Sequence, residues 1–302
     1  MHLRILGSAA GGRFPQWNCG CGNCSALRQN QFHGKARTQT QLALSADGLA
    51  WFLAGASPDL AFQIEATPSL HPRALRDSPI AGVVLASADL DHILGLLLLR
   101  ELQPLRVYAS PSILRILREE NSMFGMLNRA DPQAVWTAAK PGSPFPLLDA
   151  AGRDSGLCSE LVSLAGRYPK YVASAGLPAE EATAGLIFTS RSGKRVAYLP
   201  AVGNVDDRLI AKIQGADVLL FDGTFWSDDE LIRIESSGET ARHMGHIPVE
   251  ESLRLLNNVK AGRRVYVHIN NTNPILNEAS PEHRTVRDAG WEIAEDNWHL
   301  EL

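Results

Sequence analysis

The segment from residue 80 to 102 constrains the fold more than any other part of the sequence. Residues 80–86 form an apolar run typical of a buried strand, and residues 93–102 have the length and composition of a buried helix. A short polar run lies between them. A strand that leads through a polar turn into a helix predicts a sheet covered by helices.

Further apolar runs extend this pattern along the chain. Two runs flank a turn centred on Asp47-Gly48, which predicts an early hairpin. No Pro-, Gly- or Ser-rich linker divides the sequence, so we predict a single domain over residues 1–302. Strands are also expected over 105–109, 217–221 and 264–269, and helices over 112–119 and 248–256.

The composition fits a packed globular protein. Of the 302 residues, 45% are hydrophobic and 21% are charged, which is enough apolar surface for a core. The formal net charge of −4 and the lack of a Lys/Arg run give no reason to expect nucleic acid or a membrane as a partner. No signal-peptide pattern is visible, so we expect a cytoplasmic protein with reduced thiols.

Three cysteines stand within six residues. Cys19, Cys21 and Cys24 are separated by glycines and one Asn, and thiolates at this spacing suit a structural Zn²⁺. The alternative is that the three are unrelated buried cysteines. A closed zinc shell needs a fourth ligand from elsewhere, and His33 is near in sequence.

Two carboxylates and an imidazole follow the strand over residues 80–86. Asp89, Asp91 and His92 stand at its carboxyl end, where α/β sheets place their ligands, and they can meet one cation. The alternative is that these Asp residues cap the next helix.

Three more polar residues stand in similar places. Asp222 and His268 end apolar strands, and His246 precedes a helix. For Asp222 alone, a plain turn residue is the simpler interpretation.

The Asp91-His92-x-x-Gly95 motif after a strand resembles the end of the metallo-β-lactamase signature. The resemblance implies an α/β fold, an αββα sandwich of two mixed sheets with helices on the outer faces, and makes His268 the last metal ligand. The segments DVLLFDGTFW and HMGHIPVEES resemble the phosphodiesterase branch of that superfamily. A phosphonate-pathway enzyme of this branch also carries a Cys-x-Cys-x-x-Cys zinc loop, with a late His three residues after its last site His. Asn271 stands at that position here, so Asn271 and His33 are both candidates for the fourth zinc ligand.

Longer motifs resemble the pyrroloquinoline quinone (PQQ) biosynthesis protein B family. They are GSAAGGRFPQWNCGCGNC, ASPDLAFQI, SADLDH and VHINNTNPIL, and the resemblance runs from residue 3 to the C-terminus. It implies a role in PQQ biosynthesis, a route that starts from a peptide whose Glu and Tyr become cross-linked.

The departures from the hydrolase signature suggest the chemistry. Ser87 and Asp89 stand where the signature has its first two histidines. The chain therefore lacks metal ligands that a two-metal hydrolase needs. His92, His268 and one or two carboxylates from Asp89 and Asp91 would suit a non-haem Fe²⁺. We therefore predict hydroxylation of the Tyr ring of the Glu–Tyr substrate, with Asp222 and His246 as catalytic residues that orient substrate or move protons.

Two alternatives stay open at this point. One is a non-catalytic carrier, or transport factor, for PQQ or an intermediate. The other is a hydrolase with a single Zn²⁺ and Asp222 or His246 as general base. We also expect a homo-oligomer and contacts with other proteins of the PQQ pathway.

Overall fold

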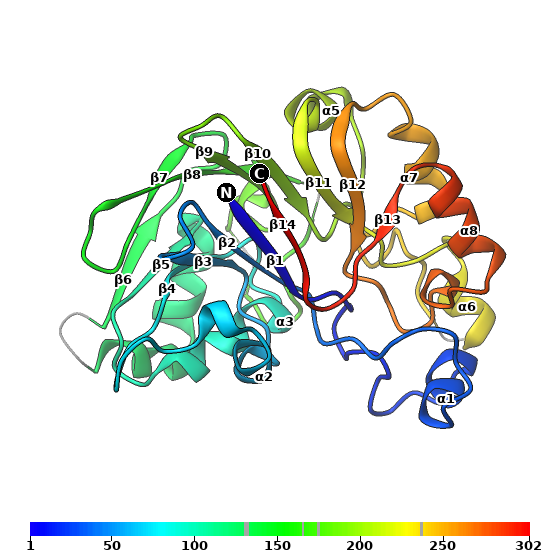
Figure 1. The fold of residues 1–302 in the computed structure, drawn as a ribbon, viewed down its shortest axis with the longest axis horizontal. Helices are drawn as coiled ribbons and strands as arrows, with labels where there is room; N and C mark the ends of the chain where they lie inside the picture. The colour runs from blue at the N-terminus through cyan, green and yellow to red at the C-terminus, as the bar shows by residue number, and fades with distance from the viewer. Residues whose placement is uncertain (130–132, 165, 174–175, 236–237) are drawn as a thin grey trace. The chain divides into compact units, whose positions relative to one another are not determined.

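A computed structural model describes residues 1–129, 133–164, 166–173, 176–235 and 238–302 (Figure 1). The chain divides into two compact units, each made of stretches that are separate in the sequence. Unit 1 comprises Met1–Leu6, Gln41–Lys194 and Asn297–Leu302, and unit 2 comprises Gly7–Thr40 and Arg195–Asp296. That the 302 residues form one domain stays a prediction.

Unit 1 contains a mixed sheet in the order β14-β1-β2-β3-β4-β5-β6. The N-terminal β1 pairs antiparallel with the C-terminal β14, as Figure 1 shows in blue and red. β2 and β3 are antiparallel, whereas β3 to β6 run parallel. The bounds are β1 (His2–Gly7), β2 (Gln41–Ser45), β3 (Trp51–Ala54), β4 (Ile80–Val84), β5 (Leu105–Ala109), β6 (Ala134–Ala138) and β14 (Trp298–Glu301).

The early hairpin is confirmed by the pairing of β2 with β3. In its turn, the Asp47 carboxylate accepts the N–H groups of Leu49 and Ala50 at 2.8 and 3.3 Å. Gly48 has φ +79, a left-handed conformation that glycine adopts at little cost. The turn residues therefore fix the register of this hairpin.

The central strands of this sheet are apolar on both faces. β3 and β4 are buried throughout, as expected for parallel strands covered on both sides. Their side chains join one hydrophobic cluster with the helical segments of unit 1. Each fully buried Val or Leu in it contributes about 1.5–3 kcal/mol relative to exposure.

The segment after β4 differs from the continuous helix predicted over residues 93–102. A short α3 (Leu90–Ile93) passes into the 3₁₀ helix η2 (Leu94–Leu99). At this point Gly95 donates its N–H to the Ala56 carbonyl at 2.8 Å, outside the helix. The two backbones lie so close there that an added Cβ on Gly95 would be 2.2 Å from the carbonyl oxygen of Ser57. The apolar run is therefore shaped by its packing, which sequence periodicity does not report.

The remaining elements of unit 1 are one antiparallel ladder and several short helices. Strands β7, β8 and β9 pair in that order. Their bounds are β7 (Phe145–Leu148), β8 (Asp154–Ser163) and β9 (Ala184–Ser190). The helices are α2 (Leu60–Glu65), η1 (Pro68–Leu70), α4 (Pro111–Arg115), the π-helical η3 (Ile116–Glu120), η4 (Ser122–Asn128) and η5 (Ala179–Glu181).

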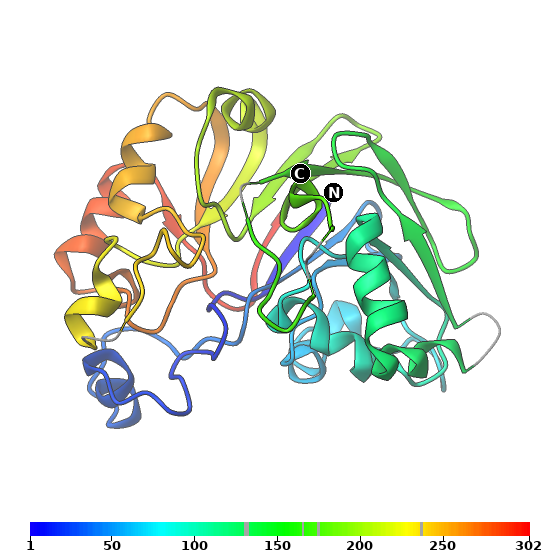
Figure 2. The ribbon, with the colours of Figure 1, turned by 180° about the vertical axis from the view of Figure 1, so that it is seen from behind.

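Unit 2 is built on four parallel strands in the order β13-β12-β11-β10. Helices connect successive strands, as parallel pairing requires (Figure 2). The strands are β10 (Arg195–Leu199), β11 (Ala216–Asp222), β12 (Ala261–Val267) and β13 (Glu292–Ile293). The helices are α1 (Gly22–Arg28), α5 (Asp207–Ile213), α6 (Glu230–Ile234), α7 (Val249–Leu255), η6 (Pro274–Leu276) and α8 (Pro281–Asp288).

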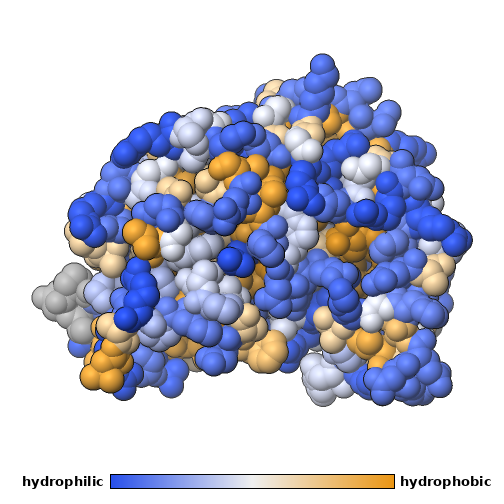
Figure 3. All heavy atoms as spheres, in the orientation of Figure 1, coloured by the Kyte–Doolittle hydropathy of each residue, from blue (hydrophilic) through white to orange (hydrophobic). Residues whose placement is uncertain are grey.

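The predicted fold class is confirmed, because the strands form two mixed sheets accompanied by helices. The face drawn in Figure 3 is mainly hydrophilic, with separate apolar areas. Within the described residues, no helix has the length and apolar character needed to span a bilayer.

Candidate metal centre

The carboxylate of Asp222 lies at the centre of a buried hydrogen-bond network in unit 2. Asp222 ends β11 and is completely buried. Its Oδ1 accepts both the N–H and the hydroxyl of Thr224, at 3.0 and 2.6 Å. Its Oδ2 accepts the N–H of Val202 at 2.8 Å and Nδ1–H of His246 at 2.7 Å. Two bonds to each oxygen use the acceptor capacity of a carboxylate, so Asp222 is suited to orienting its neighbours.

Two buried imidazoles lie beside this carboxylate. The rings of His246 and His268 stack with centroids 5.4 Å apart and planes 22° from parallel. Their Nδ1 atoms lie 3.0 and 2.9 Å from the Thr224 hydroxyl oxygen. Asp222, His246 and His268 offer potential ligand atoms within 4.8 Å of one another. Because the oxygens of Asp222 are already engaged and His246 is predicted to be catalytic, we regard His268 as the metal-ligating candidate of this group.

The backbone of His268 is held in an unfavourable conformation. His268 follows β12 with φ +58, a left-handed value that costs a residue with a Cβ on the order of 1 kcal/mol. Its carbonyl accepts the Thr224 hydroxyl at 2.9 Å. The next residue, Ile269, donates its N–H to Ser8 and accepts the N–H of Ala10, both at 2.9 Å. Strain maintained by such bonding is typical of functional sites.

In unit 1, Asp89 does not act as a side-chain cap of α3. It occupies the N-cap position without a side-chain capping bond, and its Oδ2 accepts the Ser87 hydroxyl at 2.8 Å. The alternative that Asp89 is a capping carboxylate is therefore wrong. Asp91 Oδ2 lies 3.9 Å from Nε2 of the buried His92.

The turn after β3 supports His92. The N–H of Ala56 donates to the His92 carbonyl at 2.7 Å. Gly55 has φ +80, and an added Cβ there would lie 3.2 Å from His92 Nδ1. The buried Gln41 holds this turn, because its Nε2 donates to the Gly55 carbonyl at 2.9 Å and its Oε1 accepts the Ser57 N–H at 2.7 Å.

Tyr171 contacts the same segment from another part of unit 1. Its hydroxyl donates to the carbonyl of Ala88 at 2.5 Å. Partial burial raises the pKa of Tyr171 to about 12, and the charge of Asp89 adds to this shift. The phenol therefore stays protonated and keeps its hydrogen bond near neutral pH.

The predicted ligands of the active-site metal come from both units. Asp89, Asp91 and His92 belong to unit 1, and His268 belongs to unit 2. That the four share one ion stays a prediction from the sequence. Within unit 2 the structure brings His268 together with both predicted catalytic residues, Asp222 and His246.

The cysteine loop forms a compact cluster with Asn271. The sulfurs of Cys19, Cys21 and Cys24 lie within 4.8 Å of one another. The side-chain amide nitrogen of Asn271 lies 3.1, 3.6 and 3.4 Å from them, in that order. A half-turn of this amide would bring its oxygen toward the three sulfurs, so the donor set fits one zinc ion.

The thiols of this cluster differ in acidity. Burial opposes ionisation of Cys19, but hydrogen bonds from Cys21, Cys24 and Asn271 outweigh it and lower the pKa of Cys19. Burial raises the pKa of Cys24 to about 11, and the charge of Cys21 adds to the shift. Three thiolates so close together need a cation to be stable at neutral pH, which favours a metal at this loop.

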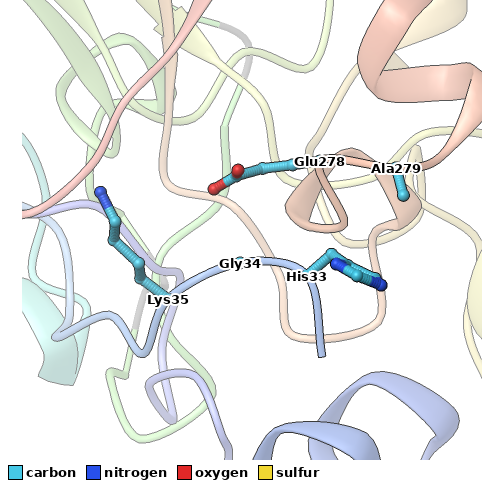
Figure 4. A pocket seen from close by; sticks show the side chains of 5 residues that line it. All are labelled: His33, Gly34, Lys35, Glu278 and Ala279. Atoms are coloured by element: carbon cyan, nitrogen blue, oxygen red, sulfur yellow. The ribbon is translucent and has the colours of Figure 1, made fainter. Parts of the chain in front are cut away.

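His33 lies at a different feature of unit 2. It lines a hollow of about 510 Å³ together with Gly34, Lys35, Glu278 and Ala279 (Figure 4). The Lys35 amine there is paired with Glu295 at 2.6 Å. Among the described residues, the metal-ligand cluster of the cysteine loop does not include His33. Asn271 is therefore the better candidate for the fourth zinc ligand.

Sequence reasoning missed Thr224, Gln41 and Glu230. Thr224 stands two residues after Asp222, and this Asp-Gly-Thr spacing is the only signal that could have indicated it. Gln41 lies 14 residues before Gly55 and Glu230 lies 42 residues before Thr272, so no local pattern reveals these two contacts.

Comparison with known proteins places this chain in a family. A model described as "Beta-lactamase superfamily domain" matches residues 50–269. Coenzyme PQQ synthesis protein B of Methylorubrum extorquens is 42% identical over 308 residues, which cover all of both chains. This chain belongs to the PQQ synthesis protein B family. The expected role in PQQ biosynthesis is thereby supported for the chain.

Solved structures agree with the family assignment. The crystal structure of Zn²⁺-bound PqqB from Methylobacterium extorquens has a TM-score of 0.91 and 42% identity, with full coverage of both chains. A diphosphatase of the PhnP family has a TM-score of 0.70 at 20% identity and covers all of this chain and 96% of its own. The second similarity shows the shared fold alone. The PQQ synthesis protein B family thus uses a metallo-β-lactamase fold.

Glu230 connects two loops that flank the site of this family member. It opens α6 and is almost fully buried. Its Oε2 accepts the N–H of Trp226 at 2.6 Å, and its Oε1 accepts the hydroxyl of Thr272 at 2.5 Å. Burial raises the pKa of Glu230 from 4.5 to about 7, although both hydrogen bonds oppose the shift.

This shift predicts a pH-dependent stability. Neutral Glu230 contributes fully to the free energy of unfolding below pH 4.5, and this contribution is lost as the pH rises through about 7. The free energy of unfolding falls by about 3 kcal/mol over this range. Glu230→Gln imitates the neutral acid and should lack this loss. Urea unfolding from pH 5 to 8 should show wild type falling more steeply than the variant, while the exposed Glu250→Gln follows wild type. Equal slopes for wild type and Glu230→Gln would disprove the account.

Proposed function

We propose that this protein is an Fe²⁺-dependent hydroxylase that acts in PQQ biosynthesis on the tyrosine ring of a Glu–Tyr-derived precursor. The observation that carries the proposal is the buried network of Asp222, Thr224, His246 and His268, which orients two imidazoles around a saturated carboxylate. The sequence prediction adds Asp89, Asp91 and His92 as further ligands. The imidazoles of His92 and His268, with a carboxylate of Asp89 or Asp91 and open positions, would form a ligand set that suits non-haem iron.

The donor set fits an iron ion better than a pair of hydrolytic zinc ions. In the superfamily signature, two histidines stand where this chain has Ser87 and Asp89. Here the Ser87 hydroxyl is bonded to the Asp89 carboxylate, which gives the segment oxygen donors in place of imidazoles. Bound Fe²⁺ would supply the activation of O₂ that ring hydroxylation requires, and a reductant must provide two electrons for each turnover.

The residues of the chain have separable tasks in this proposal. His268 supplies a ligand from its strained turn. His246 donates its Nδ1 proton to Asp222 at 2.7 Å. Its Nε2 can therefore accept a proton from the phenol of the substrate or return one to it. Asp222 is a positioning residue, since it touches His246 and Thr224 and is completely buried.

The PqqB structure supports a metal-binding role, because it is described as Zn²⁺-bound. We propose that the cysteine loop of this chain holds one structural zinc ion, with Asn271 as the fourth ligand. Contacts with other PQQ-pathway proteins and self-association belong to the same proposal.

Removal of the amide tests this zinc ligand. Asn271→Ala should weaken zinc binding 10–100-fold, because one ligand of a closed tetrahedral shell is lost. His33→Ala is the matched control and should retain zinc as wild type does. Zinc competition with a chelator measures both, and a loss confined to His33→Ala would contradict the assignment.

Anaerobic loading with Fe²⁺ tests the function itself. Zinc-containing wild type should bind one iron and, once O₂ and an external two-electron reductant are added, consume O₂ while hydroxylating a Glu–Tyr dipeptide-like substrate, detected by mass spectrometry. His268→Ala should lose iron, and His92→Ala should too if the sequence prediction is right. His246→Ala should keep iron but lose 10²–10⁴-fold in turnover.

His243→Ala is the control, because this exposed histidine lies on the same loop as His246. It should match wild type in both iron content and turnover. A wild type that binds PQQ but neither iron nor O₂ would favour the carrier, and zinc-dependent cleavage would favour the hydrolase. Either result would overturn the hydroxylase proposal.

A further inference from the structure

We propose that Thr224 is a positioning residue whose hydroxyl sets the tautomer of His268 and so makes Nε2 of His268 available to a metal ion. Thr224 is buried, with 2% of its surface exposed. This inference rests on the proposed function only in taking His268 as a ligand.

The hydroxyl of Thr224 has more neighbours than it has protons. Its oxygen lies 2.6 Å from Asp222 Oδ1, 2.9 Å from the His268 carbonyl, and 3.0 and 2.9 Å from Nδ1 of His246 and His268. A hydroxyl has one proton and two lone pairs. The carboxylate and the carbonyl can only accept, so they compete for that proton.

The shortest contact decides where the proton goes. A bond to an ionised carboxylate is roughly twice as strong as one between neutral groups, and Asp222 Oδ1 is also the nearest acceptor. With its proton turned toward Asp222, the Thr224 oxygen presents its lone pairs to the two imidazoles. Both Nδ1 atoms must then donate, which leaves a lone pair on Nε2 of each ring.

The opposite arrangement is unfavourable. If Thr224 donated to Nδ1 of His268, the proton of that imidazole would move to Nε2, where it would block metal binding. Asp222 Oδ1 would also lose its shortest hydrogen bond. Burial makes such a loss costly, because no bulk water is there to replace the donor.

The two histidines differ in how they depend on Thr224. His246 donates Nδ1–H to Asp222 Oδ2 at 2.7 Å as well as facing Thr224 at 3.0 Å. His268 faces the Thr224 hydroxyl at 2.9 Å. His246 keeps its bond to Asp222 when the hydroxyl is removed, so its tautomer should be spared and it serves as an internal control. For His268, removal of the Thr224 oxygen takes away an acceptor that its Nδ1 faces at 2.9 Å, so we expect its tautomer to shift.

The test compares Thr224→Val, which keeps the shape of the side chain, with Thr224→Ser, which keeps the hydroxyl. ¹⁵N NMR of histidine-labelled, iron-free protein with zinc in its cysteine loop reports the protonated nitrogen of each ring at pH 8. We expect His268 to be Nδ1-protonated in wild type and Thr224→Ser, and to shift toward Nε2 protonation in Thr224→Val. His246 should stay Nδ1-protonated in all three proteins.

Anaerobic Fe²⁺ titration gives the second readout. Thr224→Val should bind Fe²⁺ 10–100-fold more weakly, and Thr224→Ser should restore binding. Zinc retained in the cysteine loop verifies that unit 2 is folded. An unchanged His268 tautomer in Thr224→Val, or a Thr224→Ser that behaves like Thr224→Val, would overturn the inference. If wild type binds no Fe²⁺ but the tautomer shifts as expected, the proposed function fails and the role of Thr224 stands.

Discussion

The hydrogen-bond saturation of Asp222 is the constraint on which the candidate site depends. A completely buried carboxylate is tolerable only when donors surround it, and four donors do so here. Those donors come from the turn after β10, the turn after β11 and the loop before α7. The hydrogen bonds to the Asp222 carboxylate thus fix the relative positions of these three loops. They also position His246, which lies on one of the loops, and His268, which contacts Thr224.

The loop after β12 also connects the candidate metal centre with the cysteine loop. His268 and Asn271 stand three residues apart on one loop after β12. Asn271 contacts the three sulfurs, and Thr272 next to it bonds to the buried Glu230. A zinc ion held by the cysteines would therefore stabilise the loop that presents His268.

Much of the fold follows from local sequence, but the network does not. The apolar runs predicted the hairpin of β2 and β3 and strands β4, β5, β11 and β12, because burial on both faces leaves a continuous apolar pattern. The helix predicted over 93–102 was partly wrong, since a backbone contact at Gly95 is invisible in periodicity. Asp222, His246 and His268 could be selected as polar residues beside strand ends or a helix start. Thr224 could not, because its importance comes from three partners brought together by folding.

X-ray absorption spectroscopy of Fe²⁺-loaded wild type, with zinc already in the cysteine loop, tests the central claim most directly. The account predicts an iron shell of nitrogen and oxygen donors with the multiple-scattering signature of imidazole. A shell containing sulfur would mean that iron enters the cysteine loop instead. That result would contradict the claim that the network around Asp222 prepares a metal centre.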